Sequence, residues 1–300
     1  MTSNTTSRHN RGLFEALAAY AIWGTLPLYI YGLRDVPPFE LVGWRSAFTL
    51  PMCLLILAAT RRTYLVRQTM GNPRILGALA VSALLIGANW VIYAYAVQQG
   101  HVLAASLGYY INPLVSVIAG TVIFRERLSR AQWLAVTIAA LGVALLAWGS
   151  LNMLWISLSL ALTFGGYGIV RKLTPVDALP GLTVETILLF VPAVAAISWS
   201  AAGPQGMALG RGVLHDSMLL SAGIITATPL LLFTSAARKL DLSLLGFIQF
   251  VAPTTQFILG LTWFGEPLKP AQIACFVLIW LAIGIFCYDM FMRRDRRAPQ

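Results

Sequence analysis

The stretch GYYINPLVSVIAGTVIFRERLSRAQW, residues 108–133, places an Asn-Pro pair inside an apolar run and then turns charged. The stretch IQFVAPTTQFILGLTWFGEPLKPAQI, residues 248–273, repeats this pattern 140 residues later. The identical pairs are Pro113 and Pro253, Ile118 and Ile258, Gly120 and Gly260, Phe124 and Phe264, Glu126 and Glu266, Leu128 and Leu268, Ala131 and Ala271, and Gln132 and Gln272. The chain therefore contains an internal duplication.

A second alignment extends this duplication towards the N-terminus. At a shift of 141, residues 14–30 lie over residues 155–171 and pair Gly24 with Gly165 and the aromatic Trp23 with Phe164. The same shift pairs two further identical residues, Leu41 with Leu182 and Pro51 with Pro192.

The composition excludes an ordinary soluble domain. Of the 300 residues 58% are hydrophobic and 11% charged, and the mean hydropathy is +0.75, whereas soluble domains are about one quarter charged. Each apolar segment has about the length that crosses a hydrocarbon core as a helix. We place ten of them at 13–33, 41–59, 75–97, 103–124, 131–149, 152–170, 182–201, 217–237, 243–264 and 271–292.

We therefore predict an all-α integral membrane protein with ten transmembrane helices arranged as two inverted five-helix repeats. The repeats would be residues 13–149 and 152–292, with tails at 1–12 and 293–300. Because five is odd, the second repeat crosses the membrane in the opposite sense. Inverted repeats are typical of alternating-access transporters. The alternative is a duplication kept for stability alone, since channels also contain inverted repeats.

The positive charge points to a membrane rather than to nucleic acid. Counted over alternate connections, 17 of the 21 Lys and Arg residues fall on one side, and the other side takes Arg34, Arg45, Arg211 and Lys269. By the positive-inside rule both termini lie in the cytoplasm. We expect a multi-pass protein of the bacterial inner (plasma) membrane. A cleavable signal is not expected, because a polar tail precedes the first apolar run.

The two central prolines predict a polar site at mid-depth. Each proline frees the carbonyl four residues earlier, at Tyr109 and Gln249, and lipid tolerates such a break only against other helices or a wet cavity. We predict hinges at Pro113, Pro253 and Pro229. The polar residues near the breaks are Tyr109, Tyr110, Asn112, Gln249 and Gln256. A packed kink with bonded amides is the alternative.

Two charges lie about one turn inside their segments, Arg45 and Glu185. Charged residues within a membrane are functional candidates by default. Both could instead be anchors, because long side chains can extend to the interface. The partners would then be Asp35 or Glu40 for Arg45, and Arg171 or Lys172 for Glu185.

The third segment offers a wall for an organic solute, formed by Asn89, Trp90 and Tyr93. Trp90 could equally face lipid. His101 is a candidate proton sensor or a solvated turn residue.

Other polar residues are assigned to helix ends. Ser129 to Gln132 reads as a capping box, and Lys269 to Gln272 places a proline at a helix start. We expect Glu126 and Glu266 to serve caps and tight turns.

No sequence pattern indicates catalysis. The chain has no P-loop, no H-E-x-x-H and no C-x-x-C. Cys53, Cys275 and Cys287 fall in apolar segments and are expected to be free thiols. We predict no catalytic residue, metal or cofactor.

Several segments carry a family resemblance: AIWGTLPLY, residues 21–29, residues 87–133, VETILL, residues 184–189, and LGFIQFVAPTTQFILG, residues 245–260. They resemble the RarD-type branch of the EamA family, in the drug/metabolite transporter superfamily. The resemblance implies ten helices, cytoplasmic termini and a cavity built chiefly by helices 1, 3, 4, 6, 8 and 9. It implies that the cavity is lined or shaped by Trp23, Asn89, Tyr109, Asn112, Gln249 and Pro253. One departure is Trp44, where the family pattern has His before Arg45.

Together these observations predict a secondary permease for small organic metabolites or drug-like solutes, most simply an exporter of the RarD type. The predicted substrate-binding residues are Trp23, Arg45, Asn89, Trp90, Tyr93, Tyr109, Asn112, Glu185 and Gln249. The expected partners are a small-molecule substrate and the lipid bilayer, with no nucleic acid, and a monomer is compatible with the sequence. The alternative is a non-transporting membrane sensor or assembly factor on a transporter-like fold.

Overall fold

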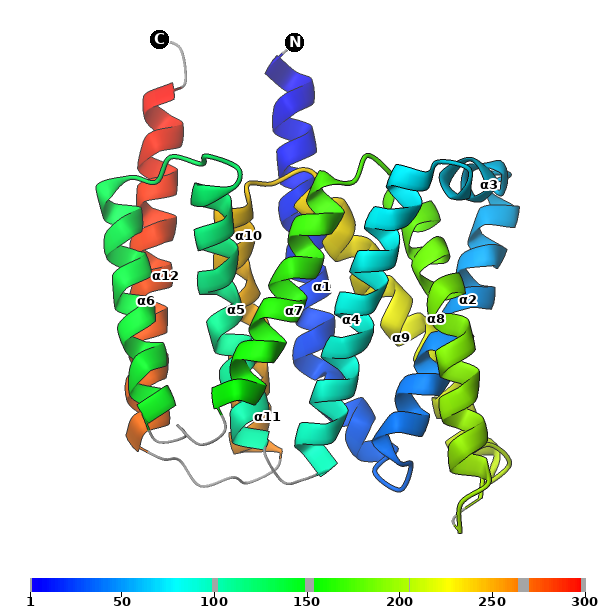
Figure 1. Ribbon diagram of the computed structural model, residues 1–300. Coiled ribbons are helices and arrows are strands. Elements are labelled where there is room, and N and C mark those ends of the chain that lie inside the picture. Colours follow the sequence, from blue (N-terminus) through cyan, green and yellow to red (C-terminus); the bar gives the residue numbers. More distant parts are fainter. Residues whose placement is uncertain (1, 99–101, 149–153, 205, 264–269, 298–300) are drawn as a thin grey trace.

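The protein is a bundle of α-helices (Figure 1). The structure is a computed structural model and describes residues 2–98, 102–148, 154–204, 206–263 and 270–297; every regular element in these ranges is a helix. The helices are α1 (Thr2–Gly32), α2 (Pro38–Ala59), α3 (Tyr64–Met70), α4 (Pro73–Gln98), α5 (Val102–Val122), α6 (Arg130–Trp148), α7 (Leu154–Leu173), α8 (Ala178–Ala201), α9 (Val213–Ala237), α10 (Leu242–Gln249), α11 (Val251–Thr262) and α12 (Pro270–Arg297).

The helices follow the apolar segments predicted from the sequence, with three differences. The connection at 60–74 contains the short helix α3. The ninth segment is divided into α10 and α11 at Phe250. The tails are helical where described, because α1 begins at Thr2 and α12 runs on to Arg297.

Six helices of the described part are long and apolar enough to cross a membrane: His9–Gly32, Pro38–Ala59, Pro73–Tyr93, Leu154–Leu173, Ala178–Ala201 and Val213–Ala237. Two shorter apolar stretches, Arg130–Leu145 and Ile273–Asp289, belong to α6 and α12. Within a bilayer a helix satisfies its own backbone hydrogen bonds, which an open strand or a loop does not.

The outside of the bundle is apolar, as expected for a surface that faces lipid. Large hydrophobic side chains are exposed on most helices, among them Leu84, Ile118, Leu141, Leu162, Val191, Trp199, Ile224 and Val277. An apolar surface of this extent would make a soluble protein aggregate. The buried polar residues include two arginines, three glutamates and two asparagines, so the polarity pattern of a soluble protein is partly reversed.

The helices pack in pairs across the bundle (Figure 1). α6 packs on α12 at one edge, and α2 packs on α8 towards the opposite edge. Between these pairs, α5 contacts α7 and α10, while α1 contacts α9 and α11. The α4 helix lies against α7 and α8. This arrangement brings α1, α4, α5, α7 and α9–α11 around the centre.

Both ends of the chain lie at the same end of the bundle (Figure 1). We call it the terminal end; the opposite one is the distal end. The connections at 60–74, 123–129, 174–177 and 238–241 lie at the terminal end, and those at 33–37, 202–204 and 206–212 lie at the distal end.

Close packing of α2 against α9 depends on Gly223, because a Cβ atom there would lie 2.4 Å from the Phe48 carbonyl oxygen. We expect Gly223→Ala to lower the free energy of unfolding by about 1–3 kcal/mol, the usual cost of overpacking. The measurement is thermal unfolding of the purified protein in detergent.

The matched control is Gly77→Ala in α4, where a Cβ atom meets nothing within 4 Å. Alanine favours a helix over glycine by about 1 kcal/mol, so Gly77→Ala should leave the midpoint unchanged or raise it. Equal midpoints for the two variants would show that α2 and α9 do not approach this closely.

Candidate functional site

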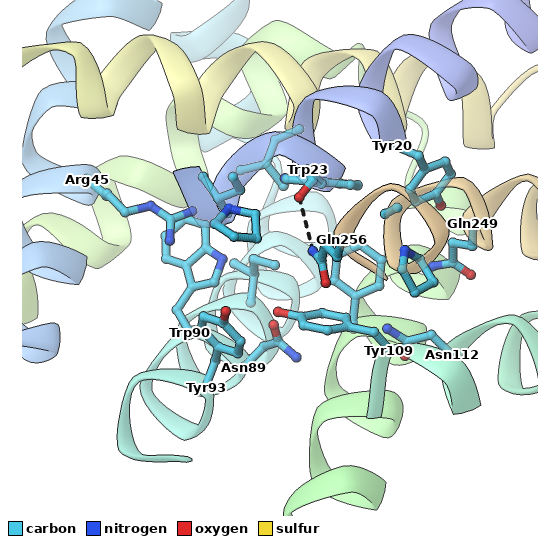
Figure 2. A pocket seen from close by; sticks show the side chains of 17 residues that line it. Tyr20, Trp23, Arg45, Asn89, Trp90, Tyr93, Tyr109, Asn112, Gln249 and Gln256 are labelled. Carbon is cyan, nitrogen blue, oxygen red and sulfur yellow. Dashed lines mark hydrogen bonds between the residues drawn. The ribbon is translucent and has the colours of Figure 1, made fainter. Parts of the chain in front are cut away.

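A cavity lies at mid-depth among α1, α2, α4, α5, α7, α9, α10 and α11, and 17 side chains line it (Figure 2). Its empty volume is about 800 Å³, including the space at its mouth. A concave lining of apolar and aromatic side chains with a few polar groups is typical of small-molecule sites.

Eight predicted substrate-binding residues line this cavity: Trp23, Arg45, Asn89, Trp90, Tyr93, Tyr109, Asn112 and Gln249. Pro253, one of the three predicted hinges, also lines it, whereas Pro113 and Pro229 lie within α5 and α9 and are absent from the lining. The lining residues that were not among the predicted site residues are Tyr20, Leu26, Pro27, Ile86, Phe164, Leu230, Ala252 and Gln256. One signal for Phe164 existed in the sequence, because it is the repeat partner of Trp23.

Arg45 is buried at one end of the cavity rather than extended to the interface. Its side chain is 7% exposed, its Nε donates to Thr226 Oγ1 at 3.0 Å, and its guanidinium carbon lies 5.0 Å from the centre of the Trp90 ring. Trp90 therefore faces the cavity and not lipid.

The expected anchoring partners of Arg45 are engaged elsewhere. Asp35 pairs with Arg211 at 3.2 Å. Glu40 is buried and accepts hydrogen bonds from the Trp44 indole, the Ser200 hydroxyl and the Ala208 backbone N–H. Arg45 therefore pairs with neither acid, and the alternative that it is an interfacial anchor does not describe this structure.

Amide side chains gather at the other end of the cavity (Figure 2). Asn112 is 2% exposed, and within the described part of the chain its Oδ1 has no hydrogen-bond partner. Gln249 Oε1 accepts a hydrogen bond from Ser116 Oγ at 3.1 Å. Buried polar atoms without partners are uncommon in native proteins, so this end offers free hydrogen-bonding capacity.

Two other amides are used to join helices. Asn89 Nδ2 donates to the Leu160 carbonyl and to Thr163 Oγ1, both at 3.0 Å, which ties α4 to α7. Gln256 Nε2 donates to the Trp23 carbonyl at 3.2 Å. That carbonyl is the one that Pro27 deprives of its helical partner, so α11 completes the hydrogen bonding of α1.

Aromatic rings close the cavity towards the terminal end. Trp23 lies 5.5 Å from both Tyr20 and Phe164, and Phe233 lies 5.2 Å from Phe164 and 6.0 Å from Tyr167. Offset and edge contacts at these distances are favourable. We call these five residues the aromatic cluster. Tyr20, Tyr167 and Phe233 are almost fully buried.

The central prolines differ in their effect on the backbone. Pro113 stands inside the continuous helix α5. Pro253 follows the break at Phe250, which ends α10 and begins α11. Tyr110, expected near these breaks, packs edge-on against Phe276 of α12 at 5.4 Å and does not line the cavity.

Glu185 does not line the cavity, although it was predicted to bind substrate. It is 1% exposed and lies 3.6 Å from Arg171 Nε, whose side chain is fully buried. Ser82 on α4 donates a hydrogen bond to its Oε1. The predicted pairing with Arg171 is present, but the pair is buried among α4, α7 and α8 instead of reaching the interface.

The predictions for helix ends are confirmed where the structure describes them. The Ser129 hydroxyl accepts from the Gln132 N–H, and Gln132 Oε1 accepts from the Ser129 N–H, both at 2.9 Å, which makes a capping box. Glu126 accepts from the Leu242 and Ser243 N–H groups at 2.6 and 2.9 Å and caps α10. His101 and Glu266 lie outside the described residues.

Comparison with known proteins gives consistent matches. The profile of the EamA-like transporter family matches residues 10–148. The chain is 41% identical to an uncharacterized transporter of Pseudomonas aeruginosa, over 98% of this chain and 99% of that protein. It is 40% identical to protein RarD of Streptomyces exfoliatus over 96% of this chain and 91% of that protein, and 38% identical to protein RarD of Escherichia coli over 95% and 97%.

A solved crystal structure of a protein has a similar fold, with a TM-score of 0.69 over 91% of this chain and 96% of the other. The two sequences are 18% identical, so this likeness concerns the fold alone.

The buried pair of Arg171 and Glu185 gives a stability prediction. Removing one partner leaves an uncompensated charge in the protein interior, which costs about 3–5 kcal/mol. We expect Glu185→Leu and Arg171→Met each to lower the unfolding midpoint in detergent strongly, and the double variant to recover most of the loss.

The exposed pair of Arg238 and Asp177, at 2.9 Å, serves as the control. Asp177→Asn should change the free energy of unfolding by no more than about 1 kcal/mol. A double variant as unstable as the sum of the two single variants would contradict the assignment of Arg171 and Glu185 as a coupled pair.

Proposed function

Because the chain belongs to the RarD-type branch of the EamA-like transporter family, we propose that it is a secondary permease that moves small organic solutes by alternating access. The observation that carries this proposal is the cavity at mid-depth, lined by aromatic rings, amides and one arginine inside a bundle with an apolar exterior. Export from a bacterial cell across the inner membrane is the proposed direction.

The transmembrane arrangement proposed is ten spans in two inverted repeats, with α10 and α11 forming one span. Figure 1 supports the inversion, since α1 runs from the terminal to the distal end and its repeat partner α7 runs back. The neighbours of these helices also correspond. α1 contacts α9 and α11, and α7 contacts α4 and α5, which are the repeat partners of α9 and of α10–α11.

The close contacts of two glycines support the same correspondence between the repeats. A Cβ atom on Gly24 would lie 2.6 Å from the Thr255 side chain, and one on Gly165 would lie 2.6 Å from the Val115 side chain. Gly165 is the repeat partner of Gly24, and Thr255 stands 140 residues after Val115. Equivalent residues thus make equivalent close contacts between helices in the two halves.

The distribution of basic residues supports cytoplasmic termini. The connections at the terminal end contain Arg61, Arg62, Arg67, Arg125, Arg127, Arg238 and Lys239, whereas those described at the distal end contain Arg34 and Arg211. Under the positive-inside rule the terminal end is the cytoplasmic face.

The shape of the cavity supports a state closed to the cytoplasm. In α1, α4 and α5 the lining residues run from the helix middle towards the distal end, and the aromatic cluster lies on the terminal side. Polar contacts join the helices there, including Lys239 to Glu15 at 2.6 Å. In the alternate state these contacts would separate and the distal side would close, with α5, α9 and α10–α11 bending at Pro113, Pro229 and Pro253.

The amides of Asn112 and Gln249 give the first test of transport. Proteoliposomes are loaded with a metabolite extract, and the solutes that leave are identified by mass spectrometry. We expect Asn112→Ala combined with Gln249→Ala to lower the flux of the transported solute at least about tenfold, since each lost hydrogen bond in a dry site costs on the order of 1–3 kcal/mol.

The exposed amide variant Gln68→Ala in α3 is the matched control and should transport normally. An absence of flux for every solute in the extract, together with a stable protein partner that copurifies, would favour the sensor or assembly-factor alternative.

The break at Phe250 gives a second test, directed at the hinges. Pro253→Ala restores the N–H that can bond the Gln249 carbonyl and so join α10 to α11. We expect slower exchange between the two states, seen as a lower maximal flux with a substrate KM that changes little. Pro51→Ala, at an exposed proline of α2 outside the cavity lining, should leave flux unchanged. Equal flux for both variants would contradict a hinge at Pro253.

A further inference from the structure

Arg45 is a buried cation that faces a cavity without a buried acid to neutralise it. Among the described residues no carboxylate lies within 4 Å of its side chain, and no Asp or Glu lines the cavity. The neighbours that position it are uncharged: the Thr226 hydroxyl at Nε and the Trp90 ring. An unpaired charge in a medium of low dielectric constant is costly, so a bound anion would stabilise this arrangement.

The contacts of Arg45 leave its Nη groups available. Its hydrogen bond to Thr226 uses Nε alone. The remaining edge of a guanidinium matches the two oxygens of a carboxylate. Trp90 fixes the plane of the group from one face. The geometry is therefore that of a prepared anion site at one end of the cavity.

The residues in the middle and at the opposite end of the cavity indicate which other groups a ligand would need. Figure 2 shows aromatic side chains, including Trp23 and Tyr109, between Arg45 and the amides of Asn112 and Gln249. Flat rings stack favourably against such walls. At the far end Asn112 Oδ1, which has no partner among the described residues, is available to accept a hydrogen bond. A small inorganic anion would fill only the Arg45 end.

We propose that the transported solutes are organic monoanions with a carboxylate at Arg45, an aromatic or flat apolar body, and a hydrogen-bonding group at Asn112. This proposal rests on the proposed function. It also predicts discrimination against an ammonium group next to the carboxylate, since the lining provides no acid to receive it.

Binding to the purified protein in detergent tests the ligand class without any flux measurement. Calorimetry compares 3-(4-hydroxyphenyl)propionate with its neutral amide, with the corresponding amine and with tyrosine, which adds the α-ammonium group. We expect the carboxylate to bind at least about tenfold more tightly than the amide and the amine, the effect of one charge-assisted bidentate pair. We expect it also to bind at least about tenfold more tightly than tyrosine, whose ammonium group would meet no acid in the lining.

Arg45→Gln should reduce carboxylate binding to the level of the amide. Arg45→Lys should retain a preference for the carboxylate with weaker affinity, and provides a second variant if the first does not fold. Arg34→Gln removes the same charge at an exposed position over Tyr31 and should bind as the unmodified protein does.

Three results would overturn the proposal: equal binding of carboxylate, amide and amine; unchanged carboxylate binding in a folded Arg45→Gln variant; or phosphate or chloride binding as tightly as the organic anion. Flux of uncharged solutes without carboxylate preference would overturn the ligand class and leave the permease intact. Carboxylate binding without flux of any carboxylate would instead overturn the permease.

Discussion

The structure depends on one constraint: a backbone carbonyl freed inside a membrane must find another partner. Pro27 takes the helical partner from the Trp23 carbonyl, and Gln256 of α11 supplies a side-chain N–H in its place. This bond links the first and ninth predicted spans beside the cavity. Each helix break therefore requires polar partners inside the bundle. For this reason the interior near the breaks is not uniformly apolar.

The buried polar residues serve two purposes, and different residues serve each. Asn89 joins α4 to α7 through its amide nitrogen, and the buried pair of Arg171 and Glu185 joins α7 to α8. Asn112 and Arg45 retain groups that no neighbouring side chain satisfies. The contacts that join helices fix their arrangement in the bundle. The groups without a partner remain available to form hydrogen bonds with a solute in the proposed site.

Sequence reasoning located the helices and most of the cavity because both follow from local patterns. Runs of apolar residues mark helices, and prolines with nearby amides mark the interior, as Asn112 and Gln249 show. Arg45 and Glu185 lie at similar distances from their segment ends, yet only Arg45 lines the cavity. The neighbouring helices account for the difference. Arg45 contacts Thr226 and Trp90, whereas Glu185 contacts Arg171 and Ser82. Contacts between distant segments of this kind are not encoded in any single segment.

Residues without a local signal were missed for the same reason. Leu230 and Ile86 line the cavity with ordinary apolar side chains, which a lipid-facing position would carry equally well. Tyr110 differs from its neighbour Tyr109 only in helical phase, yet it packs against Phe276 outside the cavity. Assigning helix faces requires the packing of α5 between α7, α10 and α6 to be known.

The hydrogen bonds between Glu126 and the start of α10 have a mechanical consequence. Its carboxylate holds the first backbone N–H groups of α10 from the connection between α5 and α6, whereas α11 is fastened to α1 through Gln256. α10 is therefore attached to the connection between α5 and α6, and α11 is attached to α1. If α10 moved away from the core in the proposed transport cycle, it would either carry residues 123–129 with it or break its hydrogen bonds to Glu126. An acidic side chain outside the cavity would then oppose part of that motion.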